Sequence, residues 1–235
     1  REALTIVFFL PMMYQALIAE PEVRRRDLSR VRMACYAMAP MAPERMDDIR
    51  ELFPNADVLL GAGQTEFTPP TVFQRPEHQW DKAASWGPPT AVTRVGIMDE
   101  EGNLLPPGEV GEIVYRGPQA MTGYLNLPEK TDESFEHGWF HSGDVGYADE
   151  EHVIWFTDRK KDMVKTGGEN VASIEVERCL LAHPAVAEAA VIGVPDERWG
   201  EAVTAVVVLT EGGGADEAEL IEHCRQRLGG FKVPK

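Results

Sequence analysis

The stretch "LLGAGQTEFTPP", residues 59–70, carries two apolar residues into a Gly-Ala-Gly turn, which a Thr-Glu pair and two prolines follow. An apolar run that ends in glycines indicates a strand whose end exposes backbone N–H groups toward a ligand. At that end Thr65 can donate to a phosphate oxygen, and the carboxylate of Glu66 can hold Mg²⁺ against the phosphate. The alternative is a strand terminator followed by solvated side chains, and the stretch by itself favours that alternative.

The segments around this turn predict an α/β layer, because apolar runs alternate with a helical pattern. Two short apolar runs are expected strands, and one segment spaces its apolar residues as an amphipathic helix does. We therefore assign residues 1–84 to an α/β subdomain of a larger domain. The expected strands are 5–10 and 56–60, and the expected helix is 43–53 with Met46, Ile49 and Phe53 on its apolar face.

The rest of the chain has two other patterns, so the expected fold class is α/β followed by α+β. Residues 85–158 contain short β-rich pieces between Gly, Pro and Asn turns, which predict a small antiparallel β-barrel or sheet. Residues 159–235 predict a hinge and a small α+β domain, with the charged linker "DRKKD" between the two patterns. The expected elements are helices at 173–184, capped by Ser173, and 216–228, capped by Asp216, and strands at 186–194 and 202–210.

The composition excludes some classes of partner. With 23 Lys and Arg against 39 Asp and Glu, the net charge of −16 repels a nucleic-acid backbone, although local donors and a bound cation can still hold a small anion. The three cysteines lack metal-ligand spacing and predict buried thiols in a reducing, cytoplasmic compartment. The apolar run near the start contains Pro11 and is too short to span a bilayer.

Two further stretches contain candidate ligand-binding residues. Asp144 follows a Ser-Gly turn in "GWFHSGDVG", where an ionised carboxylate can accept both hydroxyls of a ribose or can cap a β-turn. His141 is expected to pack or hydrogen-bond, because no Ser or Cys in the context of a nucleophile lies near it in the sequence. The stretch "TDRKKDMVKTGG" fits either a phosphate-binding cleft with a hinge or a solvated linker, and the linker is preferred for Lys160. Its basic residues are Arg159, Lys160, Lys161 and Lys165, and Gly167 and Gly168 follow them.

Taken together, these stretches resemble the adenylate-forming superfamily, which includes acyl-CoA synthetases, firefly luciferases and the adenylation domains of nonribosomal peptide synthetases. The resemblance rests on six motifs in the superfamily's order, and it covers essentially the whole chain. The motifs are "MAPMAPE" near residue 40, "GAGQTE", "GEIVYRGPQAMTGYLNLPEKT", "WFHSGDVG", "DRKKDMVKTGGENV" and the terminal "FKVPK".

The resemblance implies a ligase that works in two steps. A carboxylic acid attacks the α-phosphorus of ATP to give an acyl-adenylate and pyrophosphate, and the thiol of coenzyme A then displaces AMP. By position, Thr65 would contact phosphate, Glu66 would bind Mg²⁺, and Asp144 and Arg159 would hold the ribose hydroxyls. The other implied residues are Ala39, Pro40, Gly61, Ala62 and Gly63 at the nucleotide pocket, Lys161 at a hinge, and Lys165, Gly167, Gly168 and Glu169 in a loop that lines the pantetheine channel.

Within the superfamily, "DRKKDMVKTGGENV" looks like the acyl-CoA synthetases, which favours coenzyme A over a carrier protein as the acceptor. Met and other apolar residues around the implied cleft are compatible with a fatty or other apolar acid, although plain core packing explains them better. The alternatives are an adenylation domain that loads a carrier protein and a non-catalytic nucleotide-binding remnant.

Four departures from the superfamily's pattern bear on activity. The phosphate loop with its lysine, expected upstream, and the lysine expected after "VPK" are both absent from the sequence. We therefore expect a fragment with little or no adenylation activity of its own. Ala62 stands where an aromatic residue is common, and "AMAP" at 37–40 replaces a Gly-Gly-Ala-Pro turn. Our hypothesis is that Met38 fills the space beside Ala62.

Overall fold

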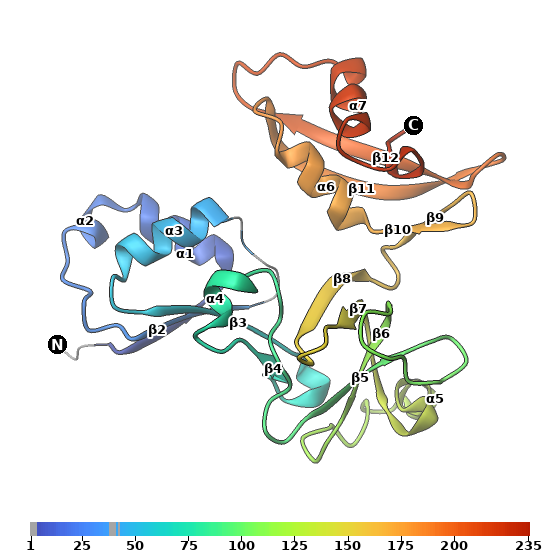
Figure 1. Cartoon of the computed structure of the whole chain (residues 1–235), viewed down its shortest axis with the longest axis horizontal. Coiled ribbons are helices and arrows are strands. Elements are labelled where there is room, and N and C mark those ends of the chain that lie inside the picture. Colours follow the sequence, from blue (N-terminus) through green and yellow to red (C-terminus); the bar gives the residue numbers. More distant parts are fainter. Residues whose placement is uncertain (1–3, 38–40, 42) are drawn as a thin grey trace. The chain divides into compact units, whose positions relative to one another are not determined.

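The computed structural model describes residues 4–37, 41 and 43–235, and the chain divides into two compact units. The first unit comprises Arg1–Ser142 and Gly146–Phe156, and the second comprises Gly143–Val145 and Thr157–Lys235. Figure 1 colours the chain from blue at the N-terminus to red at the C-terminus. Within the described part of the chain, no helix has the length and apolar character required to cross a membrane.

The first unit begins with a four-stranded sheet in the order β1-β2-β3-β4. Strands β1, β2 and β3 run parallel, and β4 pairs antiparallel with the end of β3. Helices α1 and α3 lie together over one face of this sheet (Figure 1), which is the α/β layer that the sequence predicted. The elements are β1 (Ile6–Phe9), α1 (Pro11–Ala19), α2 (Pro21–Arg24), β2 (Met33–Ala37), α3 (Pro43–Leu52), β3 (Asp57–Ala62), the 3₁₀ turn η1 (Thr65–Phe67), β4 (Val72–Phe73) and α4 (His78–Asp81).

Helix α3 has the amphipathic pattern predicted for it. Met46, Ile49 and the following Phe53 are buried, and the ring of Phe53 lies 6.4 Å from that of Tyr14 on α1. Helix α1 begins at Pro11. A proline cannot donate to a strand ladder but suits the first position of a helix, so the same residue separates β1 from α1.

Strand β2 was not predicted from the sequence. Its residues Ala34, Cys35 and Tyr36 are all buried, and the strand has a neighbour on each edge. A central parallel strand packs on both faces, so apolar and polar residues do not alternate along it. The Tyr14 hydroxyl donates to the Cys35 carbonyl at 2.8 Å, which ties α1 to the centre of the sheet.

Two buried glutamine side chains bond to the edge of β3 that faces away from β2. Gln79 Oε1 accepts from the backbone N–H of Val58 at 3.1 Å, and Gln74 Oε1 accepts from that of Leu60 at 2.8 Å. Buried backbone donors require partners, and these amides supply the carbonyl oxygens that a further strand would otherwise provide.

The next region of the chain is a four-stranded sheet in the order β5-β6-β7-β8, with β5 antiparallel to β6. The predicted β-rich character is confirmed. Of the two forms expected, a small barrel or a sheet, the ladders of the described residues form a sheet, with β5 and β8 at its ends. The elements are β5 (Arg94–Met98), β6 (Gly111–Arg116), α5 (Pro128–Ser134), the 3₁₀ turn η2 (Glu136–Gly138), β7 (Phe140–Ala148) and β8 (Ile154–Arg159).

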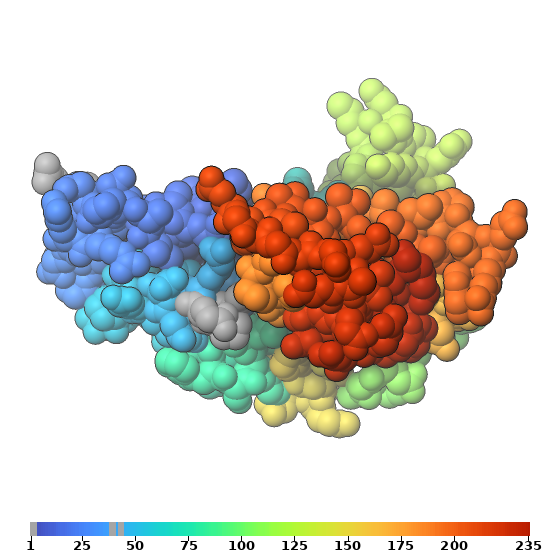
Figure 2. Space-filling view, turned by 90° about the horizontal axis from the view of Figure 1, so that it is seen from above, coloured from blue at the N-terminus to red at the C-terminus, as the bar shows by residue number. Residues whose placement is uncertain are grey.

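The second unit has the α+β structure predicted for residues 159–235. Its sheet has the order β10-β9-β12-β11, and β11 and β12 form a long antiparallel hairpin. The core includes Val176 and Leu180 of α6, Val191 of β11 and Val203 of β12. Figure 2 shows α7 and the C-terminal residues, in red, in one continuous surface with the orange part of this unit. The elements are β9 (Val164–Thr166), β10 (Glu169–Val171), α6 (Ser173–Leu181), β11 (Val186–Asp196), β12 (Gly200–Leu209), α7 (Glu217–Arg225) and the 3₁₀ turn η3 (Gly230–Lys232).

The expectation that Ser173 caps its helix is wrong. Ser173 is the first residue of α6, and the buried carboxylate of Asp158 caps the helix instead. Asp158 Oδ2 accepts from the Ser173 N–H, from the Ser173 hydroxyl at 2.9 Å and from the Ile174 N–H at 3.4 Å. The capping residue lies in β8 and not among the residues that directly precede α6, so a local sequence pattern cannot reveal it. Asp216 does cap α7, as predicted.

Candidate functional site

The turn after β3 presents the Thr-Glu pair of the opening stretch. Residues Thr65–Phe67 form η1, in which Thr65 is exposed, Glu66 is half-buried and Phe67 is fully buried. The ring of Phe67 lies 5.5 Å from that of Tyr115 and 5.9 Å from that of Phe140. This aromatic cluster anchors the turn, so the hydroxyl of Thr65 and the carboxylate of Glu66 project from a fixed base.

The glycines of the turn have packing roles within the chain. A Cβ on Gly61 would lie 2.7 Å from the ring of Phe73, and one on Gly63 would lie 2.9 Å from Pro69. Ala62 is buried in the core, and its carbonyl accepts from the Thr71 N–H at 2.9 Å. These contacts explain the Gly-Ala-Gly sequence without a ligand, and the assignment of the three residues to a nucleotide pocket stays a prediction.

The two carboxylate oxygens of Glu66 differ in their hydrogen bonding. Its Oε1 accepts from the hydroxyl of Tyr124 at 3.0 Å, and in the part of the chain that the structure describes its Oε2 has no hydrogen-bond partner. No group of three or more His, Cys, Asp or Glu among the described residues is placed to hold a metal ion. Mg²⁺ bound with a nucleotide typically takes one or two carboxylates and the phosphates, so a single glutamate beside a threonine hydroxyl fits this ion.

Hydrogen bonds from side chains tie the start of strand β7 to other parts of the chain. Gln64 Nε2 donates to the Ser142 carbonyl at 2.6 Å. The ring of His141 bonds to Glu112 Oε2 at 3.1 Å through Nδ1 and to the Glu136 carbonyl at 3.2 Å through Nε2. His141 is therefore a hydrogen-bonding residue, as predicted, and both of its ring nitrogens are engaged.

In the second unit, Asp144 and Arg159 form an ion pair. Asp144 Oδ1 lies 3.6 Å from Arg159 Nε; the side chain of Asp144 is 8% exposed and that of Arg159 is 53% exposed. Asp158 Oδ1 accepts from the Arg159 N–H at 2.8 Å, which fixes the backbone of this residue. A buried carboxylate offers acceptors for hydroxyl groups, and an accessible guanidinium offers donors and positive charge for an anion.

The basic stretch after β8 forms a turn and a hairpin. Lys161 is exposed in the turn at 160–162, and the Lys160 N–H donates to the Gly143 carbonyl at 2.8 Å. Gly167 and Gly168, with φ of +60° and +86°, connect β9 to β10. Two-residue hairpin turns of this kind require positive φ, which glycine adopts without strain. Lys165 and Glu169 lie on the two strands of the hairpin and are exposed.

The structure thus brings together some of the predicted residues. Thr65 and Glu66 lie side by side in the first unit, and Asp144 and Arg159 pair in the second. Ala39 and Pro40, and with them the hypothesis about Met38, lie outside the described residues. The contacts of Tyr124, Gln64 and Asp158 were missed from the sequence, because each partner lies far along the chain and no spacing rule connects them.

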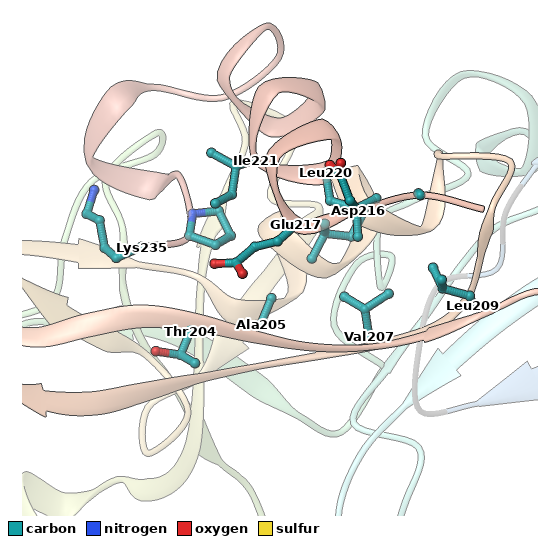
Figure 3. Close-up of a pocket in the computed structure, with 12 residues that line it drawn as sticks. Thr204, Ala205, Val207, Leu209, Asp216, Glu217, Leu220, Ile221 and Lys235 are labelled. Carbon is teal, nitrogen blue, oxygen red and sulfur yellow. The ribbon is translucent and has the colours of Figure 1, made fainter. Parts of the chain in front are cut away.

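A groove of about 400 Å³ lies in the second unit. Figure 3 shows Leu220 and Ile221 of α7 on one side of it and Ala205, Val207 and Leu209 of β12 on the other. Its lining is mostly apolar and also includes Asp216, Glu217 and Lys235. None of the residues predicted from the sequence as binding or catalytic lines this groove.

Comparison with known proteins assigns two parts of the chain. Residues 1–125 match the family model described as AMP-binding enzyme, and residues 175–235 match the AMP-binding enzyme C-terminal domain. A feruloyl-CoA synthase from Amycolatopsis sp. is 43% identical over 235 residues, covering 100% of this chain and 48% of that protein. A medium/long-chain-fatty-acid–CoA ligase, FadD8, from Mycobacterium tuberculosis is 38% identical over 243 residues, covering 100% of this chain and 42% of that protein.

The solved structures show the same similarity. The o-succinylbenzoate CoA synthetase from Bacillus subtilis, in complex with its acyl-adenylate intermediate, matches with a TM-score of 0.87 and 33% identity, covering 99% of this chain and 46% of that one. The chain spans about half the length of the curated relatives it matches.

Proposed function

This chain belongs to the family of AMP-binding enzymes, and from that premise we propose that the protein is an AMP-forming acid–thiol ligase, an acyl-CoA synthetase. A carboxylate oxygen of the acid attacks the α-phosphorus of ATP, the bond to the bridging oxygen of the β-phosphate breaks, and pyrophosphate leaves. The thiolate of coenzyme A then attacks the acyl carbon, and AMP leaves.

The observation that carries the proposal is the pair formed by Asp144 and Arg159. The buried carboxylate would accept the two ribose hydroxyls of the nucleotide, and the exposed guanidinium beside it would add donors and positive charge. The carboxylate is already partly desolvated and fixed in β7, so little ordering is required when the sugar binds.

At the phosphate end of the nucleotide, Glu66 would ligate Mg²⁺ and the exposed hydroxyl of Thr65 would donate to a phosphate oxygen. When bound, the ion supplies charge neutralisation at the phosphates. The contribution of the protein's own groups is to hold ATP in one position and orientation, because phosphoryl chemistry of this kind depends on placement and preorganised charge.

For the second half-reaction, Lys161 would serve as the hinge, and the hairpin at 165–169 would line the passage for the pantetheine arm of coenzyme A. The exposure of Lys161 in a short turn supports a hinge role, since few contacts oppose a change of its backbone angles. The exposed Lys165 and Glu169 flank the hairpin turn and leave this segment accessible to a ligand.

The proposed acid is a fatty or other apolar carboxylic acid. Support comes from the relatives, whose names give feruloyl and medium- to long-chain fatty acyl groups as their substrates. The acceptor is coenzyme A, in line with the CoA ligases among the relatives.

Pyrophosphate exchange with the full-length protein, across a panel of aliphatic and aromatic acids, tests this proposal. We expect exchange with apolar acids and Mg²⁺, and acyl transfer to coenzyme A but not to a carrier-protein thiol. Asp144→Asn should raise the KM for ATP about tenfold, because it removes a charged acceptor. Absence of exchange with every acid would refute the ligase, and transfer to the carrier thiol alone would refute the acceptor.

A further inference from the structure

Glu66 is held by one segment of the chain that is distant in sequence. The Met121 N–H donates to the Glu66 carbonyl at 2.7 Å, and the Tyr124 hydroxyl donates to Glu66 Oε1 at 3.0 Å. The Thr68 hydroxyl donates to the Gln119 carbonyl at 3.0 Å, just beyond the same turn. Both the backbone and the carboxylate of Glu66 are therefore positioned by residues 119–124.

Tyr124 is itself fixed by the start of α5. Its N–H donates to Thr131 Oγ1 at 2.9 Å, and that hydroxyl donates onward to the Leu127 carbonyl at 2.9 Å. The ammonium of Lys130 lies 4.7 Å from the centroid of the Tyr124 ring. Backbone, ring and hydroxyl of Tyr124 each have a partner, so the side chain is a rigid donor toward Glu66.

The direction of the contact with Glu66 follows from the two groups. An ionised carboxylate has no proton to donate, so the Tyr124 hydroxyl is the donor and Glu66 Oε1 is the acceptor at 3.0 Å.

We propose that Tyr124 is a positioning residue for the metal ligand Glu66: it engages one carboxylate oxygen and leaves the other for Mg²⁺. This inference rests on the proposed function, in which Glu66 ligates the ion. Partners that orient a metal-ligating carboxylate typically change metal affinity by about 10- to 100-fold when they are lost. Tyr124 is half-exposed, so the lower end of that range, about tenfold, is expected.

The test is Tyr124→Phe in the full-length protein, with Mn²⁺ as the probe. Binding of Mn²⁺ in the presence of a non-hydrolysable ATP analogue is followed by electron paramagnetic resonance. The Kd for Mn²⁺ should rise about tenfold, whereas the KM for the carboxylic acid and the melting temperature should not change, because the ring and its contact with Lys130 remain. Thr131→Val should give a smaller rise of the same Kd, of about threefold, because it frees the backbone of Tyr124.

Tyr147→Phe is the matched control, because the ring of Tyr147 stacks on Trp155 at 6.0 Å and a phenylalanine keeps that contact. It should leave the Kd for Mn²⁺ unchanged. An unchanged Kd in Tyr124→Phe overturns the positioning role and leaves the ligase proposal standing. A lower melting temperature of Tyr124→Phe, together with equally weaker binding of Mn²⁺, the ATP analogue and the acid, also overturns it, since that result indicates a purely structural residue. If the wild-type protein binds no Mn²⁺ with the analogue, the metal role of Glu66 fails as well.

Discussion

Replacement of Asp158 by alanine should open the start of α6. Asp158 is 1% exposed, and its carboxylate accepts four hydrogen bonds. The donors are the N–H groups of Arg159, Ser173 and Ile174 and the Ser173 hydroxyl. A capping substitution costs about 1 kcal/mol, and each buried donor left without a partner costs about 1–3 kcal/mol more. With water able to reach some of these donors in the variant, we expect a local loss of about 3 kcal/mol.

Hydrogen exchange measured by mass spectrometry on the full-length protein gives this local free energy. A loss of about 3 kcal/mol corresponds to exchange of the α6 amides that is roughly one hundredfold faster. Asp158→Asn keeps one acceptor oxygen, so exchange of the α6 amides in this variant should be faster than in the wild type and slower than in Asp158→Ala.

The matched control for this prediction is Asp216→Ala. Asp216 caps α7 at an exposed position, and the one hydrogen bond that its carboxylate accepts from the described residues is from the Glu219 N–H, at 2.9 Å. Its loss should cost about 1 kcal/mol and speed exchange in α7 roughly fivefold. Equal effects on the two helices, or less than a tenfold change at α6, would refute the argument that burial makes the Asp158 cap stronger.

Three other perturbations have defined outcomes. Gly87 and Gly108 both have φ near +86°, but a Cβ on Gly87 would lie 2.4 Å from the β4 backbone, whereas a Cβ on Gly108 would meet nothing within 4 Å. In thermal melts, Gly108→Ala should lower the free energy of unfolding by about 1 kcal/mol, and Gly87→Ala should lower it by several times that amount. Burial opposes ionisation of Asp149, but hydrogen bonds, chiefly from Lys82, lower its pKa to about 2 from 3.8. This stabilisation is therefore present above about pH 4 and is lost as the pH falls through 2, so Asp149→Asn should cost on the order of 2 kcal/mol at pH 7 by denaturant titration, and most of that cost should be gone at pH 2. Phe67→Ala removes a fully buried ring and should cost about 3–5 kcal/mol in the same titration; a cost below 1 kcal/mol would contradict the anchoring of η1.

Local patterns in the sequence were sufficient to predict the elements that have one buried face. Helix α3, with Met46 and Ile49 on its inner side, and the capped helix α7 are examples. Strand β2 could not be predicted in this way, because it is buried on both faces and its sequence does not alternate.

The candidate site was predictable only from motifs taken together. Glu66 and Asp144 were selected because several ordered motifs resemble one superfamily, since each of the two stretches alone also fits a solvated or turn-capping role. The groups that hold them were not predictable. Tyr124 and Asp158 act across long separations in the chain, and such contacts follow from tertiary packing, which no local pattern encodes.

The two sides of the first sheet differ in the backbone N–H groups that they leave open, because glutamine amides bond to β3. Beyond β3 the sheet continues into the short strand β4, and the N–H groups of Val58 and Leu60 are already bonded to Gln79 and Gln74, so neither of these two donors is open to an extended peptide. At the other end of the sheet, β1 pairs, among the strands of the described residues, with β2 alone, and it carries exposed apolar side chains. Within the part of the chain described here, a strand added to this sheet would therefore find open backbone groups beside β1 rather than at Val58 and Leu60 of β3.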